Sequence, residues 1–152
     1  MNSLQRLIPR IFEPNVFLVT TSLVIAVTAA GKIYSVAFGS IPHSPDPVIF
    51  IVSQKALLLL ATFMELVVIT IALSERFKFE TRCGCVLSLA IAFTLYRAGL
   101  YKLGIAGCNC VGTVPHNPVL SAVLWAVLGY MTVGSIWIIA TRNSKWLAGG
   151  AR

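Results

Sequence analysis

The segment from Thr81 to Gly112 holds an apolar run of about eighteen residues with a Cys-x-Cys pair at each end. All four cysteines of the chain lie in this segment. If Val86 to Leu103 is helical, a rise of ~1.5 Å per residue separates Cys85 from Cys108 by about 34 Å. The two pairs then lie near opposite faces of a membrane. The four thiols therefore cannot share one metal ion or cross-link within one chain.

The composition is that of a membrane protein. The chain of 152 residues is 57% hydrophobic and 11% charged, with a mean hydropathy of +0.86, which is far outside the range of soluble globular domains. Its net charge of +7 would suggest nucleic-acid binding in a soluble protein. Here, however, the basic residues flank apolar runs, so we expect contact with membrane lipid and no binding of nucleic acid.

Four apolar runs predict an all-α, integral membrane four-helix bundle in one domain covering residues 1–152. The predicted spans are about 16–38, 48–73, 83–103 and 118–140. Asp46-Pro47 and Asn117-Pro118 are cap and first-turn pairs ahead of the second and fourth spans. An alternative interpretation of the first run is a signal peptide, which we favour less because the run continues beyond the small residues of a cleavage site.

The distribution of basic residues predicts the orientation. Lys and Arg occur in both terminal tails and in the connection 74–82, whereas the connections 39–47 and 104–117 contain neither. By the positive-inside rule, both termini are cytoplasmic and the protein is a multi-pass protein of the inner (cytoplasmic) membrane. Cys83 and Cys85 then lie at the cytoplasmic end of the third helix, and Cys108 and Cys110 face the exterior.

The outer pair, Cys108 and Cys110, is the first candidate catalytic site. Two thiols separated by one residue close a small disulfide ring, and strained or exposed disulfides exchange readily. Such a short loop adds little stability, so exchange suits the pair better than bracing. A passive local disulfide and metal ligation across a dimer are the alternatives.

The inner pair, Cys83 and Cys85, is the second candidate. It begins a predicted helix, where the positive end of the helix dipole and Arg82 favour a thiolate. Cysteine is also a small apolar residue that is common in buried helices, and residues i and i+2 point to different sides of a helix. Both a redox role and a packing role are therefore open for this pair.

Ionisable residues inside spans form a candidate binding cluster, because such residues are rare in membranes and default to functional roles. The predicted helices place the basic side chains of this cluster in the outer half of the bilayer, with an aromatic ring beside them: Lys32, Lys55, Arg97, Tyr101 and Lys102. The cluster could stabilise a thiolate, a lipid phosphate or the reduced anion of a quinone. Alternatively, the long side chains simply reach the headgroups. An ion pair of Glu65 with Lys32 or Lys55 is left open.

Other chemistries have little support. His43 and His116 occupy the outer connections, but their spacing from the cysteines matches no zinc pattern, so we expect no metal site. A phosphate-binding glycine loop, a Ser-His-Asp arrangement and paired carboxylates are all missing from the sequence.

Three short motifs resemble the MauE branch of the DoxX-like four-helix membrane proteins: Ala30-Gly31-Lys32, Met64-Glu65-Leu66 and Cys108-Asn109-Cys110-Val111-Gly112. The resemblance implies a four-helix bundle and a redox role for Cys108 and Cys110, since MauE proteins are linked to maturation of a disulfide-rich periplasmic enzyme. A looser analogy to vitamin K epoxide reductases suggests a quinone as cofactor. The C-x-x-C of quinone-linked oxidases is absent from this chain.

These observations give two hypotheses. The first is a membrane thiol-disulfide oxidoreductase that exchanges oxidising or reducing equivalents with an exported or periplasmic partner through Cys108 and Cys110. The second is a small accessory subunit of a larger membrane complex, with a loop disulfide and a lipid-binding basic cluster. A transporter ranks third, because a chain of this length would need to form an oligomer to enclose a path.

Overall fold

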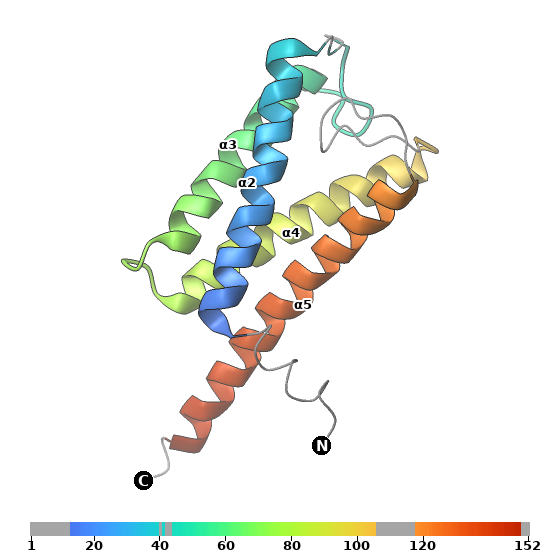
Figure 1. Cartoon of the computed structure of the whole chain (residues 1–152). Coiled ribbons are helices and arrows are strands. Elements are labelled where there is room, and N and C mark those ends of the chain that lie inside the picture. The colour runs from blue at the N-terminus through green and yellow to red at the C-terminus, as the bar shows by residue number, and fades with distance from the viewer. Residues whose placement is uncertain (1–12, 40, 42–43, 106–117, 150–152) are drawn as a thin grey trace.

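The computed structural model describes residues 13–39, 41, 44–105 and 118–149, which form four α-helices (Figure 1). In chain order they are α2 (Pro14–Phe38), α3 (Gln54–Leu73), α4 (Phe79–Lys102) and α5 (Pro118–Gly149). Each is long and apolar enough to cross a membrane, and the shortest has 20 residues, or about 30 Å of helix. The predicted all-α architecture of four helices, each long and apolar enough to span a membrane, is confirmed.

The helices pack as two antiparallel pairs, α2 with α3 and α4 with α5, and the pairs cross each other (Figure 1). The α3 helix also packs on α4, whereas α2 meets α5 over a small area. We name the two ends of the bundle by residues in their connections. The Asp46 end carries the connection between α2 and α3 and the C-terminus of α4, and the Arg76 end carries the start of α2 and the connection between α3 and α4.

The apolar core lies mainly toward the Arg76 end. Its buried members are Phe17, Leu18, Ile25, Val68, Ala72, Cys83, Val86, Leu89, Ala90, Met131 and Ile138. The Phe17 ring lies 5.4 Å from that of Tyr130, and both aromatic residues face the contact between α2 and α5. A Cβ atom at Gly134 would lie 2.3 Å from the Phe17 ring, so glycine is what allows α5 to approach α2 at this point.

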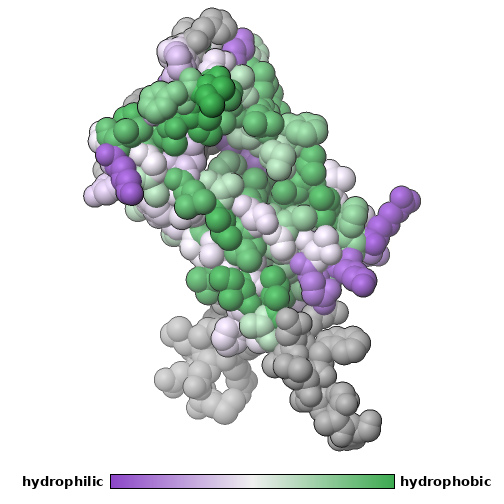
Figure 2. Space-filling model, turned by 180° about the vertical axis from the view of Figure 1, so that it is seen from behind, coloured by the Kyte–Doolittle hydropathy of each residue, from purple (hydrophilic) through white to green (hydrophobic). Residues whose placement is uncertain are grey.

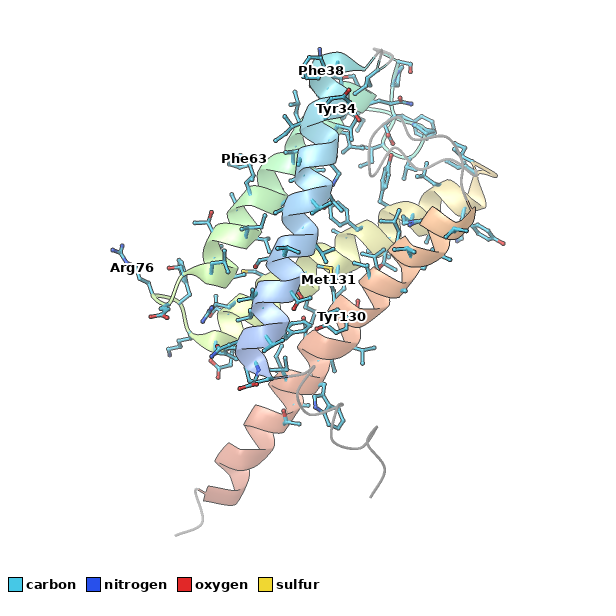
Figure 3. The ribbon with its side chains drawn as sticks, viewed as in Figure 1. Tyr34, Phe38, Phe63, Arg76, Tyr130 and Met131 are labelled. Atoms are coloured by element: carbon cyan, nitrogen blue, oxygen red, sulfur yellow. The ribbon has the colours of Figure 1, made fainter. Side chains whose placement is uncertain are left out.

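Apolar side chains also cover the outside of the bundle. Figure 2 shows hydrophobic residues over most of the described surface on one face. The outward-facing residues include Phe63 of α3, which projects from the bundle in Figure 3, and Leu23 of α2 and Leu95 of α4. A surface of this kind is stable against lipid tails, which identifies the chain as a multi-pass membrane protein.

The second span begins at Gln54, six residues after the predicted start, because Asp46 caps a turn instead of a helix. Its Oδ1 atom accepts the backbone N–H groups of Val48 and Ile49 at 2.9 and 3.0 Å. The backbone N–H of Asp46 donates to Val52 at 2.9 Å, which folds the segment back on itself. Ser53 then caps α3. Residues 48–53 therefore form a compact connection at the Asp46 end.

The third span begins earlier than predicted, at Phe79, so Arg82 lies within α4. Its Nε atom donates to the backbone carbonyl of Ala72 at 2.7 Å and so satisfies one of the free carbonyls at the end of α3. This bond ties α3 to α4 at the Arg76 end. The fourth helix extends beyond the predicted span, to Gly149.

Candidate functional site: a cavity at the Asp46 end

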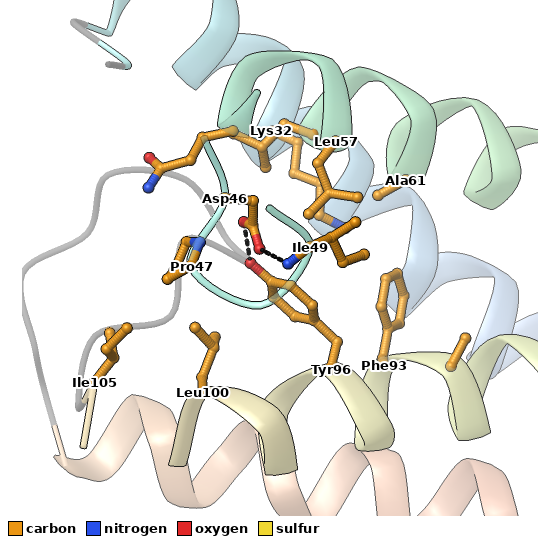
Figure 4. A pocket seen from close by; sticks show the side chains of 13 residues that line it. Lys32, Asp46, Pro47, Ile49, Leu57, Ala61, Phe93, Tyr96, Leu100 and Ile105 are labelled. Carbon is orange, nitrogen blue, oxygen red and sulfur yellow. Dashed lines mark hydrogen bonds between the residues drawn. The ribbon is translucent and has the colours of Figure 1, made fainter. Parts of the chain in front are cut away.

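A cavity of about 240 Å³ lies at the Asp46 end, between α2, α3, α4 and the connection 44–53 (Figure 4). Most of its wall is apolar, and polar side chains enter it from different elements. The lining residues are Lys32, Asp46, Pro47, Ile49, Gln54, Leu57, Leu58, Ala61, Ala92, Phe93, Tyr96, Leu100 and Ile105. An apolar cavity with a few convergent polar groups is the usual form of a small-molecule site.

One wall is held in place by a hydrogen bond from α4 to the connection. The Tyr96 hydroxyl donates to Asp46 Oδ2 at 2.7 Å (Figure 4). The other carboxylate oxygen of Asp46 accepts the two backbone N–H groups described above. Asp46 is 2% exposed, so its charge is buried but both of its oxygens have donors. Tyr96 and Asp46 together fix the connection over the cavity.

A buried ion pair lies on the opposite side of the cavity. Lys32 Nζ of α2 donates to Glu65 Oε1 of α3, and that oxygen also accepts the Thr28 hydroxyl at 3.1 Å. The Lys32 ammonium lies 4.6 Å from the centre of the Phe93 ring. Lys32 and Glu65 are 2% and 0% exposed. The pairing that the sequence left open is therefore with Lys32, and the two opposite charges balance each other inside the bundle.

Arg97 borders a second, smaller chamber of about 50 Å³ between all four helices. Its Nη2 atom donates to the Ser121 hydroxyl at 2.9 Å, and its guanidinium lies 5.1 Å from the centre of the Trp125 ring. Within the described part of the chain, Arg97 Nη1 and Glu65 Oε2 are buried without a hydrogen-bond partner. Lys32 and Phe93 line both cavities and so form the partition between them.

The other members of the predicted basic cluster lie apart from these cavities. Lys55 is half-buried near the start of α3, and Lys102 is exposed at the end of α4. Tyr101 is 83% exposed. None of these three lines either cavity. The structure thus brings Lys32 and Arg97 together around one partition and leaves Lys55, Tyr101 and Lys102 at the periphery of the bundle.

The inner cysteine pair is part of the core at the Arg76 end. Cys83 is 0% exposed and Cys85 is partly buried, and both lie in the first two turns of α4, where they are not bonded to each other. At ~1.5 Å per residue, Cys85 is about 27 Å of helix from Leu103 at the other end of α4. The pair is therefore remote from both cavities.

The outer pair, Cys108 and Cys110, lies outside the described residues, as do His43 and His116. Ile105, the last residue described before this segment, lines the larger cavity. Three residues of extended chain span at most about 11 Å, so covalent geometry alone limits the distance between the Cα atoms of Ile105 and Cys108 to about that value. Within the described residues, no group of three His, Cys, Asp or Glu side chains could hold a metal ion.

Sequence reasoning missed Asp46 and Tyr96 as members of a site, and it left the ion-pair partner of Glu65 open. For Glu65 a signal existed, because it is the only acidic residue in the four predicted spans. The sequence pattern predicts that Asp46 caps a helix. Its hydrogen bond with Tyr96 joins residues 50 positions apart, which no local sequence pattern reveals. No family model, curated protein or solved structure matches this chain.

Proposed function

We propose that this chain is a membrane thiol-disulfide redox protein, related to the MauE branch of the DoxX-like proteins, that exchanges oxidising or reducing equivalents with an exported partner through Cys108 and Cys110. The observation that carries the proposal is the cavity at the Asp46 end, whose wall ends at Ile105, three residues before Cys108. The support is that the chain between the cavity wall and Cys108 is only three residues long, so the proposal brings a reactive group close to space for a reaction partner.

The proposed orientation puts the Asp46 end on the exterior or periplasmic side of the inner membrane and both termini in the cytoplasm. The support is the absence of Lys and Arg from the sequence of residues 39–47 and 104–117, set against the basic residues of the tails and of the connection around Arg76. Cys108 and Cys110 would then meet exported proteins in an oxidising compartment.

The elementary step is attack of one thiolate on a disulfide through a mixed disulfide, followed by attack of the second thiol to release the partner. A nearby cation favours the thiolate. Lys102 is better suited to this role than Arg97, because it is exposed at the end of α4, whereas Arg97 is buried and donates to Ser121. The inner pair has no direct part in this scheme, since Cys85 lies about 27 Å from the end of α4 and exchange requires contact.

Thiol trapping tests the proposal. Intact cells are treated with a membrane-impermeant thiol reagent, with and without prior reduction, and the wild type is compared with Cys108→Ser and Cys110→Ser. We expect a mixed disulfide with an exported protein to accumulate in one of these two variants. It should be absent when Cys108 and Cys110 are replaced together. Cys83→Ser combined with Cys85→Ser is the matched control and should trap as the wild type does.

The second candidate function is an accessory subunit of a larger membrane complex. The observation that favours it is Arg97, for which no carboxylate within salt-bridge distance occurs in the described part of the chain. A partner subunit could supply the missing negative charge. Two results together would support this function in place of the redox one. Cys108 and Cys110 would stay oxidised, capture no partner and be dispensable, and large membrane subunits would copurify with the chain in stoichiometric amounts.

A further inference from the structure

We propose that the smaller chamber, between all four helices, binds a small monovalent anion such as chloride, with Arg97 and Lys32 as its hydrogen-bond donors. Every residue that lines this chamber belongs to the described part of α2, α3, α4 or α5. The inference goes beyond the redox function proposed above and does not depend on it, because no cysteine is among the lining residues.

The charged side chains that line the chamber leave an excess of one positive charge. They are Lys32, Glu65 and Arg97, and the first two balance each other in the ion pair described above. The Arg97 side chain is buried, and no carboxylate of the described residues lies within salt-bridge distance of its guanidinium. An uncompensated charge inside an apolar bundle is costly, so an anion bound beside Arg97 would stabilise the folded chain.

Asp46 is the other buried carboxylate among the described residues, and its oxygens are already engaged. One accepts the Tyr96 hydroxyl, and the other accepts the backbone N–H groups of Val48 and Ile49. Asp46 lines the larger cavity and does not line the smaller chamber. The described part of the chain therefore supplies no carboxylate that pairs with Arg97.

Hydrogen-bond donors for an anion come from two helices. Arg97 of α4 has a buried Nη1 atom without a partner, because its bond to Ser121 uses Nη2. The ammonium group of Lys32 on α2 has three N–H donors, and Glu65 is the one acceptor found for it among the described residues. An anion in the chamber can accept from both cationic groups, and such charge-assisted hydrogen bonds are the strong ones.

The size of the chamber favours a halide ion together with water. Its volume of about 50 Å³ has room for about three to five occupants of the size of water, at ~10–15 Å³ each. A halide ion is close to water in size, whereas the phosphorylated head of a lipid is much larger. Glu65 Oε2 is buried without a donor, and a water molecule beside the anion can donate one O–H group to it and the other to the anion. Anion and water together thus satisfy both unpartnered groups.

The binding test uses purified full-length protein in detergent and sodium gluconate, which is replaced stepwise by sodium chloride at constant ionic strength. The readout is the thermal unfolding midpoint, since a ligand that binds the native state raises it. Above the dissociation constant, each tenfold rise in chloride should raise the midpoint by about 3–5 °C. A midpoint that does not depend on chloride would overturn the inference.

Substitution of Ser121 separates a bound anion from a general effect of salt. Ser121→Asp puts a carboxylate beside the guanidinium of Arg97, so the excess charge is balanced within the chain. This variant should be as stable in gluconate as the wild type is in chloride, and its midpoint should not depend on chloride. Ser121→Asn is the matched neutral control and should keep the dependence. An equal chloride effect in the two variants would contradict an anion site.

Two further variants locate the anion at this chamber. Arg97→Gln removes a donor and the excess charge and leaves the balanced pair of Lys32 and Glu65, so the chloride dependence should be lost. Val127→Phe fills the chamber and should abolish the dependence as well, whereas Val123→Phe, at an exposed position of the same helix, should keep it. Chloride dependence that survives both Arg97→Gln and Val127→Phe would show that the anion binds elsewhere and that the inference is wrong.

Discussion

The two ends of the bundle use similar helices for different purposes. At the Arg76 end, Phe17, Ala72 and Cys83 are fully buried in an apolar core, and Arg82 joins α4 to α3. At the Asp46 end, the helix pairs diverge (Figure 1), and a cavity with a mostly apolar wall and a few polar side chains lies there. Close packing stabilises a bundle but leaves no room for a ligand. The Arg76 end is therefore the more closely packed of the two, and the Asp46 end is where we propose that a ligand or reaction partner has room.

The cysteines follow the same division. Cys83 is enclosed among side chains of the core. Cys108 follows the cavity wall by three residues. The two pairs have the same spacing in the sequence, but we expect them to differ in reactivity, because Cys83 is buried within a packed helix, whereas the proposed function makes Cys108 and Cys110 the reactive pair.

The largest effect on stability is expected from breaking the ion pair at the Asp46 end. Glu65→Leu leaves the ammonium of Lys32 buried without a carboxylate, which should destabilise the protein by about 3–5 kcal/mol. Glu65→Leu combined with Lys32→Met should recover most of that loss. The measurement is reversible unfolding in mixed micelles. Equal destabilisation by the single and the double substitution would show that the two side chains are not coupled.

A comparable loss is expected from a cavity in the core at the other end. Phe17→Ala removes a fully buried ring that packs against Tyr130 and Gly134, at a cost of about 3–4 kcal/mol in the same unfolding assay. Variants that remain folded at lower temperature should still trap a partner through the outer cysteines. Loss of trapping in a folded Phe17→Ala protein would break the proposed division between the two ends.

A smaller effect is expected from Tyr96→Phe. The substitution removes the hydroxyl that donates to Asp46 and leaves Asp46 Oδ2 without that donor, so the free energy of unfolding should fall by about 1–3 kcal/mol. The connection 44–53 should also become more mobile, because this bond ties it to α4. Tyr101→Phe, on an exposed side chain of the same helix, is the control and should change neither quantity.

The smallest effect is expected at the inner cysteines. Cys83→Ala removes one buried sulfur atom and should cost about 1–2 kcal/mol, with no change in partner trapping. A strong defect in thiol exchange at unchanged stability would instead assign a redox role to Cys83. Partner trapping measured at a temperature at which the variant stays folded, combined with the unfolding assay, separates the two outcomes.

The helices could be predicted from the sequence, but most of the site could not. The four spans follow from hydropathy, which is a sum over many residues and tolerates local errors. The ion pair between Lys32 and Glu65 depends on how far α2 is shifted along its axis relative to α3. A shift of one helical turn moves a side chain by ~5.4 Å, which is enough to separate the two groups. The Tyr96–Asp46 bond depends in addition on the fold of the connection, which Asp46 itself determines by capping a turn.

The most direct test of the central claim is the redox state of each cysteine pair in living cells, measured by differential thiol labelling before and after an oxidant is applied and removed. The account predicts that Cys108 and Cys110 cycle between thiol and disulfide and are labelled from the exterior, while Cys83 and Cys85 stay reduced throughout. Reversible oxidation of Cys83 and Cys85, with Cys108 and Cys110 unchanged, would contradict it.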